Sequence, residues 1–160
     1  MLDKWPILSI VTFLPLAGVL FLLMIKGDEK ALAQNSRFVA MWVSGFTFLV
    51  SLPLLIGFDS SVIGYQFEEK AVWLAGTGIG YHMGVDGISM PFVLLSTLLV
   101  PLSILASWRA ITHRVREYMI TFLVLETMMV GMFVSLDMLM FYLFFEAVLI
   151  PMFLIIGVWG

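Results

Sequence analysis

The chain has 160 residues, of which 62% are hydrophobic and 12% are charged, and its formal net charge is −3. Soluble domains are about half apolar and about one quarter charged, so this composition argues against an ordinary soluble domain. The lack of cysteine excludes disulfides, thiolate zinc sites and cysteine-ligated iron–sulfur clusters within the chain. The apolar residues form runs of about 20, the length that crosses a bilayer core, which predicts an all-α polytopic membrane protein. The alternating segments of a transmembrane β-barrel are not seen.

Five membrane-spanning helices are predicted, and together they form a single transmembrane domain over residues 1–160. A polar connection, 26–37, separates the first two helices, and a longer non-helical segment, 58–87, precedes the third. A short basic connection, 109–117, follows the third helix, and Asp137 marks a tight turn between the last two. The predicted helices span about 5–25, 38–57, 88–108, 118–136 and 138–159.

The segment 58–87 mixes glycines with two short pieces that favour strands, SVIGYQF (61–67) and AVWLAG (71–76). Glu68, Glu69 and Lys70 lie between these pieces, where a turn is expected. The pattern predicts a β-hairpin on the outer side of the membrane, between the second and third helices.

Basic residues are distributed unequally between the two sides of the predicted bundle. The connections after the first and third helices carry six of them, which are Lys26, Lys30, Arg37, Arg109, Arg114 and Arg116. The opposite side carries only Lys4 and Lys70. Since cytoplasmic loops are enriched in lysine and arginine, we expect the N-terminus to lie outside and both basic connections to face the cytoplasm or mitochondrial matrix.

Two acidic residues, Glu126 and Glu146, lie inside predicted spans, where a charge costs about 2.5–3.5 kcal/mol or more. The turn between the last two helices centres near Leu136, and each glutamate is ten residues from it. With a rise of about 1.5 Å per residue, both carboxyl groups lie about 15 Å below the outer surface. If the two groups face each other, like-charge repulsion and desolvation would favour the protonated form of at least one of them, as a group that loads and releases a proton requires. The sequence leaves open whether they do.

A proton-path role and a structural role are both open for these acids. No basic residue lies inside a predicted span, so a basic partner for Glu146 would have to come from outside this chain. Pro151 leaves the carbonyl of Ala147, next to Glu146, without its helical hydrogen bond. We therefore predict proton transfer for Glu146, with Glu126 as a second proton-transfer residue or a neighbour that tunes it. The alternative is that Glu146 only holds helices together.

Other polar residues carry no catalytic prediction. Asp137 is interpreted as a helix cap, and His82 and His113 as isolated, solvated loop residues that form no metal site. The glycine-rich stretch GTGIGYHMG is not followed by a helix of the dinucleotide-binding type. We therefore expect this chain to bind no cofactor and no nucleic acid, and redox chemistry to belong to partner chains.

Two stretches resemble a known family: YHMGVDGIS, residues 81–89, and LETMMVGMFVSLDMLMFYLFFEAVLIPMFLIIGVWG, residues 125–160. They are similar to antiporter-like subunit M of NADH:quinone oxidoreductase (respiratory complex I), which is equivalent to mitochondrial NADH dehydrogenase subunit 4. The first stretch also occurs in subunits of multisubunit sodium/proton antiporters. The resemblance covers essentially the whole chain and implies a fold of about fourteen helices, of which the five predicted here are the first part. We therefore expect these 160 residues to be a fragment.

The resemblance implies that Glu146 is the proton-transfer glutamate of the fifth helix, which pairs with a lysine on a later helix outside this sequence. Glu126 matches a fourth-helix glutamate that only part of the family has. The hairpin matches an element that links adjacent antiporter-like subunits. FMN, iron–sulfur clusters and quinone are expected in partner subunits, and the location is a bacterial inner membrane or the mitochondrial inner membrane.

The resulting hypothesis is a proton-translocating membrane-arm subunit of NADH:quinone oxidoreductase, in which partner subunits oxidise NADH and reduce quinone. The sequence is also compatible with two alternatives. One is a subunit of a sodium/proton antiporter without a redox partner, in which Glu146 would serve equally well. The other is a non-catalytic membrane scaffold.

Overall fold

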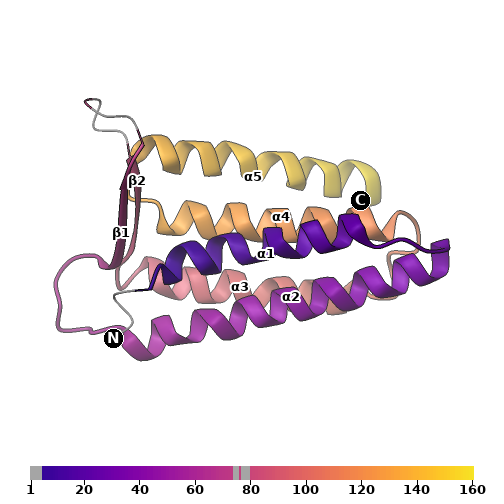
Figure 1. Cartoon of the computed structure of the whole chain (residues 1–160), viewed down its shortest axis with the longest axis horizontal. Helices are drawn as coiled ribbons and strands as arrows, with labels where there is room; N and C mark the ends of the chain where they lie inside the picture. The colour runs from indigo at the N-terminus through magenta and orange to yellow at the C-terminus, as the bar shows by residue number, and fades with distance from the viewer. Residues whose placement is uncertain (1–4, 74–75, 77–79) are drawn as a thin grey trace.

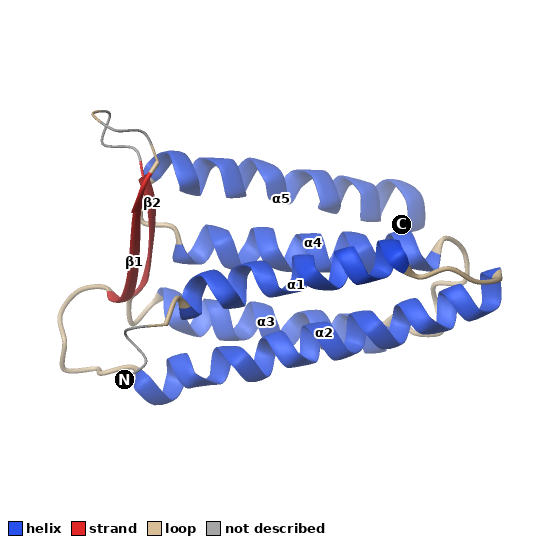
Figure 2. Cartoon of the chain, viewed as in Figure 1, coloured by secondary structure: helices blue, strands red, loops and turns tan. Residues whose placement is uncertain are grey.

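The computed structural model describes residues 5–73, 76 and 80–160. Within them are five helices, α1 (Ile7–Met24), α2 (Glu29–Gly57), α3 (Ser89–Ala106), α4 (Val115–Val134) and α5 (Met138–Trp159), and two strands, β1 (Gln66–Val72) and β2 (Gly80–Val85). The helices lie side by side, and the strands cross one end of the bundle, which we call the hairpin end (Figures 1 and 2). The basic end is the opposite one, where the α1–α2 and α3–α4 connections lie. The predicted fold class, five apolar helices with a hairpin between the second and third, is confirmed.

Each helix is long and apolar enough to cross a membrane. Helix α4 is central, since it packs against α1, α2, α3 and α5. Helix α5 packs mainly on α4 and lies at the edge of the bundle (Figure 1). The arrangement therefore gives α4 a buried environment and leaves most of α5 exposed.

The predicted polar connection 26–37 is wrong over most of its length, because α2 begins at Glu29. Residues 29–34, EKALAQ, all have good helix propensity, and Asp28 has the extended backbone of an N-cap residue. Helix α2 has 29 residues, so it is about 43 Å long and exceeds the hydrocarbon core of about 30 Å. Its first turns therefore project beyond the membrane at the basic end.

The hairpin was predicted with the wrong strands and the wrong turn. Glu68, Glu69 and Lys70 lie inside β1, where Glu69 pairs with Met83 and Lys70 with His82 in an antiparallel register. The strand AVWLAG extends into Leu74 and Ala75, which lie outside the described residues, as does Lys4 from the charge count. Charged residues are tolerated in β1 because Glu69 has partners on α1, Glu68 contacts His82 of β2, and Lys70 pairs with Glu68 within the strand.

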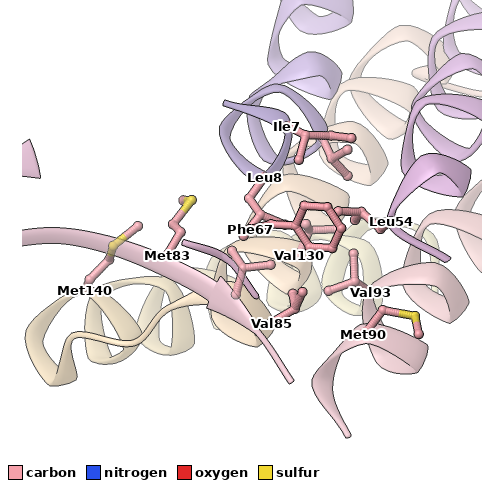
Figure 3. Close-up of a cluster of buried hydrophobic side chains, with 12 residues drawn as sticks. Ile7, Leu8, Leu54, Phe67, Met83, Val85, Met90, Val93, Val130 and Met140 are labelled. Carbon is pink, nitrogen blue, oxygen red and sulfur yellow. The ribbon is translucent and has the colours of Figure 1, made fainter. Parts of the chain in front are cut away.

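The hairpin closes its end of the bundle through Phe67. A bulge between Gln66 and Glu69 and a left-handed backbone at Phe67, with φ of 56°, turn this ring out of the strand pattern. Figure 3 shows the ring among Leu8 of α1, Leu54 of α2 and Val130 of α4. The buried ring fixes the hairpin on three helices.

Candidate functional site

Glu126 lies on the face of α4 that points into the bundle. It follows Met119 by seven residues and Leu123 by three, and it precedes Val130 by four, so these residues share one helical face. All of them are fully buried, and the exposed fraction of Glu126 is 0%. Neither carboxylate oxygen has a hydrogen-bond partner among the described residues. A buried polar group without a partner costs free energy, so among the described residues this carboxyl group makes no hydrogen bond that would join two helices.

Buried polar side chains form a layer across the bundle at the depth of Glu126. This layer divides the core into two apolar clusters. The cluster near the hairpin end includes Val11, Leu54, Val93 and Val130. The cluster near the basic end includes Leu22, Ala40, Val100 and Leu123. On each of α1 to α4, polar residues occupy the positions between the two clusters. This polar layer consists of Thr12, Ser44, Thr47, Ser51, Ser96, Thr97, Glu126 and Thr127.

Hydrogen bonds in the polar layer are mostly local. Ser51 of α2 and Thr97 of α3 share one between helices, at 3.0 Å. Thr47 donates back to the carbonyl of Val43, four residues earlier in its own helix, as serine and threonine often do. The hydroxyl groups of Thr12 and Thr127 have no partner among the described residues. The layer thus offers unpaired donors and acceptors next to a buried carboxyl group, a setting suited to internal water.

The sequence pattern could have revealed the polar layer, and it was missed. Ser44, Thr47 and Ser51 recur with the three-, four- and seven-residue spacing of one helical face. Ser96 and Thr97 lie at the corresponding depth of α3. The predicted spans 38–57 and 88–108 contain these residues, and a repeated hydroxyl on one face of a membrane helix indicates a buried polar contact.

Glu146 lies on the exposed side of α5. Buried and partly buried residues of α5, including Met140, Phe144, Ala147 and Pro151, recur with a spacing of three or four and mark its inner face. Glu146 lies nearly opposite this face, between the exposed Phe145 and the partly buried Ala147. A charged group on an apolar helix at this depth requires a polar partner or a proton.

The two predicted site residues are level with each other, but the structure does not bring them together. Glu126 is eight residues from the end of α4 at Val134, and Glu146 is eight residues from the start of α5 at Met138. Both lie about 12 Å from the hairpin end of their antiparallel helices. Glu126 faces the interior shared with α1, α2 and α3, whereas Glu146 faces away from the bundle. Within this chain they therefore form no carboxyl pair.

Pro151 and Asp137 shape α5. Pro151 is buried, and the helix continues through it to Trp159. Asp137 caps the helix by accepting hydrogen bonds from the backbone N–H groups of Leu139 and Met140, at 2.9 and 3.1 Å. The interpretation of Asp137 as a cap is confirmed.

The hairpin is docked on α1 through Glu69. Its carboxylate accepts hydrogen bonds from the backbone N–H groups of Leu8 and Ser9, at 2.7 and 3.2 Å, and from the Ser9 hydroxyl. These N–H groups belong to the first turn of α1, which lacks a side-chain cap of its own at Pro6. The glutamate from β1 therefore supplies the cap, and the positive end of the helix dipole favours its charge.

Ionisable groups at the hairpin end interact with one another. The ammonium group of Lys70 and the ring of His82 both contact the Glu68 carboxylate, at 2.7 and 2.8 Å, and lower its pKa, Lys70 more than His82. His82 thus lies in β2 with a carboxylate partner, so its prediction as a solvated loop residue is wrong. Partial burial raises the pKa of Tyr81, whose hydroxyl contacts Ser9.

Groups of three or more potential metal ligands do not occur in the described residues.

The helices and the buried carboxyl group define the class: a multi-pass α-helical membrane protein with an ionisable group in its interior. Residues 10–135 match the family described as NADH-ubiquinone oxidoreductase chain 4, amino terminus, and the chain belongs to this family. NADH-quinone oxidoreductase subunit M of Rhodobacter capsulatus is 54% identical over 155 residues, which cover 96% of this chain and 30% of that protein.

A relative and a solved structure agree with this assignment. NADH-ubiquinone oxidoreductase chain 4 of Chondrus crispus is 44% identical over 153 residues, which cover 96% of this chain and 30% of that protein. A chain of respiratory complex I from Thermus thermophilus with bound NADH matches with a TM-score of 0.75 and 28% identity, covering 96% of this chain and 29% of that one. The present chain thus spans about 30% of the length of these relatives.

Proposed function

We propose that the chain belongs to a proton-translocating membrane-arm subunit of NADH:quinone oxidoreductase. The observation that carries the proposal is that this member of the family has two carboxyl groups at one depth in adjacent membrane helices. Glu126 is buried without a hydrogen-bond partner among the described residues, and Glu146 lies on the exposed side of α5. An ionisable group within a membrane span costs free energy, and such residues in membrane proteins usually mark a path for ions or protons.

Glu146 would exchange a proton with a basic group outside these 160 residues. Its position opposite the contact face of α5 directs it toward whatever covers that face. Among the described residues, no lysine or arginine lies in the apolar middle of a helix. A lysine at the same depth would favour the charged carboxylate when it approaches and the protonated form when it withdraws. Movement or titration of that lysine would therefore load and unload the carboxyl group.

Glu126 would be the second proton-transfer residue, on the inner side of α4. The hydroxyl groups of Thr12 and Thr127 in the polar layer are also unpaired, and water held there would connect them with the carboxyl group. The two glutamates face opposite sides of the α4–α5 pair, so a proton would need water or a further side chain to pass between them. Glu126 would therefore serve a branch of the path separate from the one that Glu146 enters.

The redox steps would take place in partner subunits. The chain has no cysteine, so it offers no thiolate ligands for an iron–sulfur cluster. FMN, iron–sulfur clusters and quinone would be bound by other subunits, which oxidise NADH and reduce quinone. Adjacent antiporter-like subunits would be neighbours in the membrane arm, and the hairpin would contact one of them. The assembly would lie in a bacterial inner membrane or the mitochondrial inner membrane.

Proton pumping driven by NADH tests the role of Glu146 in the assembled complex. We expect Glu146→Gln and Glu146→Ala to lower the coupled pumping rate about 100-fold, as the loss of a proton-transfer group predicts, with normal amounts of assembled complex. Asp28→Asn is the control, since Asp28 is an exposed acid at the basic end. Wild-type pumping in both Glu146 variants would refute the proton role. Reduced assembly with a normal ratio of protons to electrons would favour the scaffold.

Labelling from each side of the membrane tests the proposed orientation. The chain has no cysteine, so single cysteines can be introduced at Ser61 near the hairpin and at Ala110 in the α3–α4 connection. Both positions are exposed. A membrane-impermeant maleimide added from outside should label Ser61→Cys and spare Ala110→Cys. The reverse labelling pattern would show that the chain has the opposite orientation in the membrane.

A further inference from the structure

A pocket of about 660 Å³ lies at the basic end, away from both glutamates. It is formed by the first turns of α2, the α3–α4 connection and the first turn of α4. Its charged lining consists of Lys30, Arg37, Arg114, Arg116, Glu29 and Glu117. We call it the basic pocket, because its lining has four cationic side chains and two carboxylates and therefore a net charge of +2.

The cationic groups of the basic pocket form no ion pair with the described residues. The ion pairs found among the described residues are both on Glu68, at the other end of the molecule. Arg37 donates from Nη2 to the carbonyl of Ile111, at 2.8 Å, which ties α2 to the α3–α4 connection and fixes the guanidinium. The Nε atoms of Arg37 and Arg116 are buried without an acceptor. A guanidinium group that keeps free donors in a fixed position is suited to bind an oxyanion in bidentate fashion.

The start of α4 adds to the positive potential of the pocket. Its N-cap residue, Arg114, has φ of 50° and provides no side-chain cap. The first helical hydrogen bond is from the N–H of Tyr118 to the carbonyl of Arg114, so the N–H groups of the preceding turn have no helical partner. Basic residues at a helix N-terminus are repelled by the positive end of the helix dipole. A bound anion would offset this repulsion and accept hydrogen bonds from the free N–H groups.

Aromatic side chains give the pocket an apolar wall on the membrane side. The rings of Phe38 and Trp108 both line it and meet edge to face, with centroids 5.4 Å apart. Tryptophan near the end of a membrane helix is typical of the interfacial zone, where lipid headgroups lie. A ligand with a phosphate and an apolar tail would match both walls of the pocket.

We propose that the basic pocket binds a phosphate-bearing anion, which a lipid headgroup or free phosphate could supply. The guanidinium groups of Arg37 and Arg116 hold the phosphate, and the start of α4 supports its charge. Lys30 and Arg114 add attraction at longer range, and Phe38 and Trp108 contact the apolar part of a lipid. This site is independent of proton transfer by Glu126 or Glu146.

The experiment uses the assembled complex in phosphatidylcholine vesicles that contain a trace of photoactivatable phosphatidylglycerol. After irradiation, mass spectrometry measures the lipid attached to residues 29–38 and 108–117. We expect attachment to fall about fivefold for Arg37→Gln or Arg116→Gln and about 25-fold for both together. Arg109→Gln is the matched control, because Arg109 belongs to the basic end but does not line the pocket, and its attachment should stay at the wild-type level.

Two further measurements make each outcome decisive. If Arg37→Gln/Arg116→Gln fails to assemble, Arg37→Lys/Arg116→Lys keeps the charge, and its attachment should be intermediate because lysine cannot bind in bidentate fashion. Inorganic phosphate is added before irradiation: a loss of lipid attachment identifies a soluble phosphate as the occupant, and unchanged attachment identifies the lipid. Equal attachment in wild type and the pocket variants, or an equal loss in Arg109→Gln, would overturn the proposal.

Discussion

Glu126 and Glu146 lie at the same depth on two helices that pack against each other, yet their side chains face opposite directions. Glu126 faces the bundle formed with α1, α2 and α3, and Glu146 faces away from it. Helix α4 presents Gly131 to Phe144 of α5, which fixes the rotation of the two helices about their axes. The α4–α5 pair therefore separates the buried polar layer on one side from the exposed, mainly apolar face of α5 that carries Glu146 on the other.

Substitution of Glu126 separates a functional from a structural role. Its carboxylate oxygens are buried and unpaired, so a side chain of similar shape without charge removes a desolvation cost. We expect Glu126→Gln and Glu126→Met to assemble at least as well as the wild type, with stability unchanged or higher by about 1–3 kcal/mol. Pumping should fall in both variants. The measurements are thermal denaturation of the purified complex and NADH-driven pumping, and a less stable complex with normal pumping would contradict this.

Loss of the Glu69 cap should loosen the hairpin. Glu69→Ala removes the acceptor for the N–H groups of Leu8 and Ser9, and hydrogen bonds to a charged group contribute about 1.5–3 kcal/mol. We expect faster hydrogen exchange at the amides of β1 and at the start of α1 in the assembled complex. Glu68→Ala is the control, because the Glu68 carboxylate contacts only other hairpin side chains at the surface. Equal exchange in the two variants would show that the docking rests on Phe67 instead.

The sequence predicted the helices well because each apolar run matches the thickness of a bilayer. It misplaced the start of α2 because polarity ends a predicted membrane span, whereas EKALAQ continues the helix in water. The hairpin was predicted with Glu69 in a turn, since an acidic residue in a strand is unfavourable unless a partner elsewhere accepts it. That partner, the start of α1, is 60 residues away in the sequence from Glu69.

The two glutamates were recognised from the sequence because they interrupt apolar runs, but their directions were not. Helix α5 is apolar on all sides, so its sequence does not indicate which side contacts α4. Packing of Phe144 on Gly131 decides this, and it depends on shape rather than on polarity. Their proton-transfer roles remain a prediction.

Gly131 is required for the close approach of α4 and α5. A Cβ atom at this position would lie 2.5 Å from the ring of Phe144. We expect Gly131→Ala to destabilise the α4–α5 contact by about 1–3 kcal/mol through overpacking, and Phe144→Leu to restore part of the loss. Gly157→Ala on α5 is the matched control, since nothing lies within 4 Å of its added Cβ atom. Thermal denaturation of the purified complex checks this, and equal midpoints for the two alanine variants would contradict it.

The start of α3 should show a pH dependence that depends on Asp86. Its carboxylate accepts hydrogen bonds from the N–H groups of Ile88 and Ser89, at 3.0 and 2.7 Å, and the bond from Ser89 is the main cause that lowers the pKa of Asp86. The Ser89 hydroxyl accepts from the N–H of Asp86, which completes a reciprocal cap.

Because the pKa of Asp86 is lower in the folded state, its charged form stabilises the cap above the unfolded-state value of about 3.9. This stabilisation is lost as the pH falls through the folded-state pKa, which lies below that value. Hydrogen exchange at the first turn of α3, corrected for the intrinsic pH dependence of exchange, should therefore rise on acidification below about pH 4. Asp86→Asn keeps an acceptor without a titrating group, so its corrected exchange should be flat over this range. A rise of equal size in the variant would assign the pH dependence to another residue.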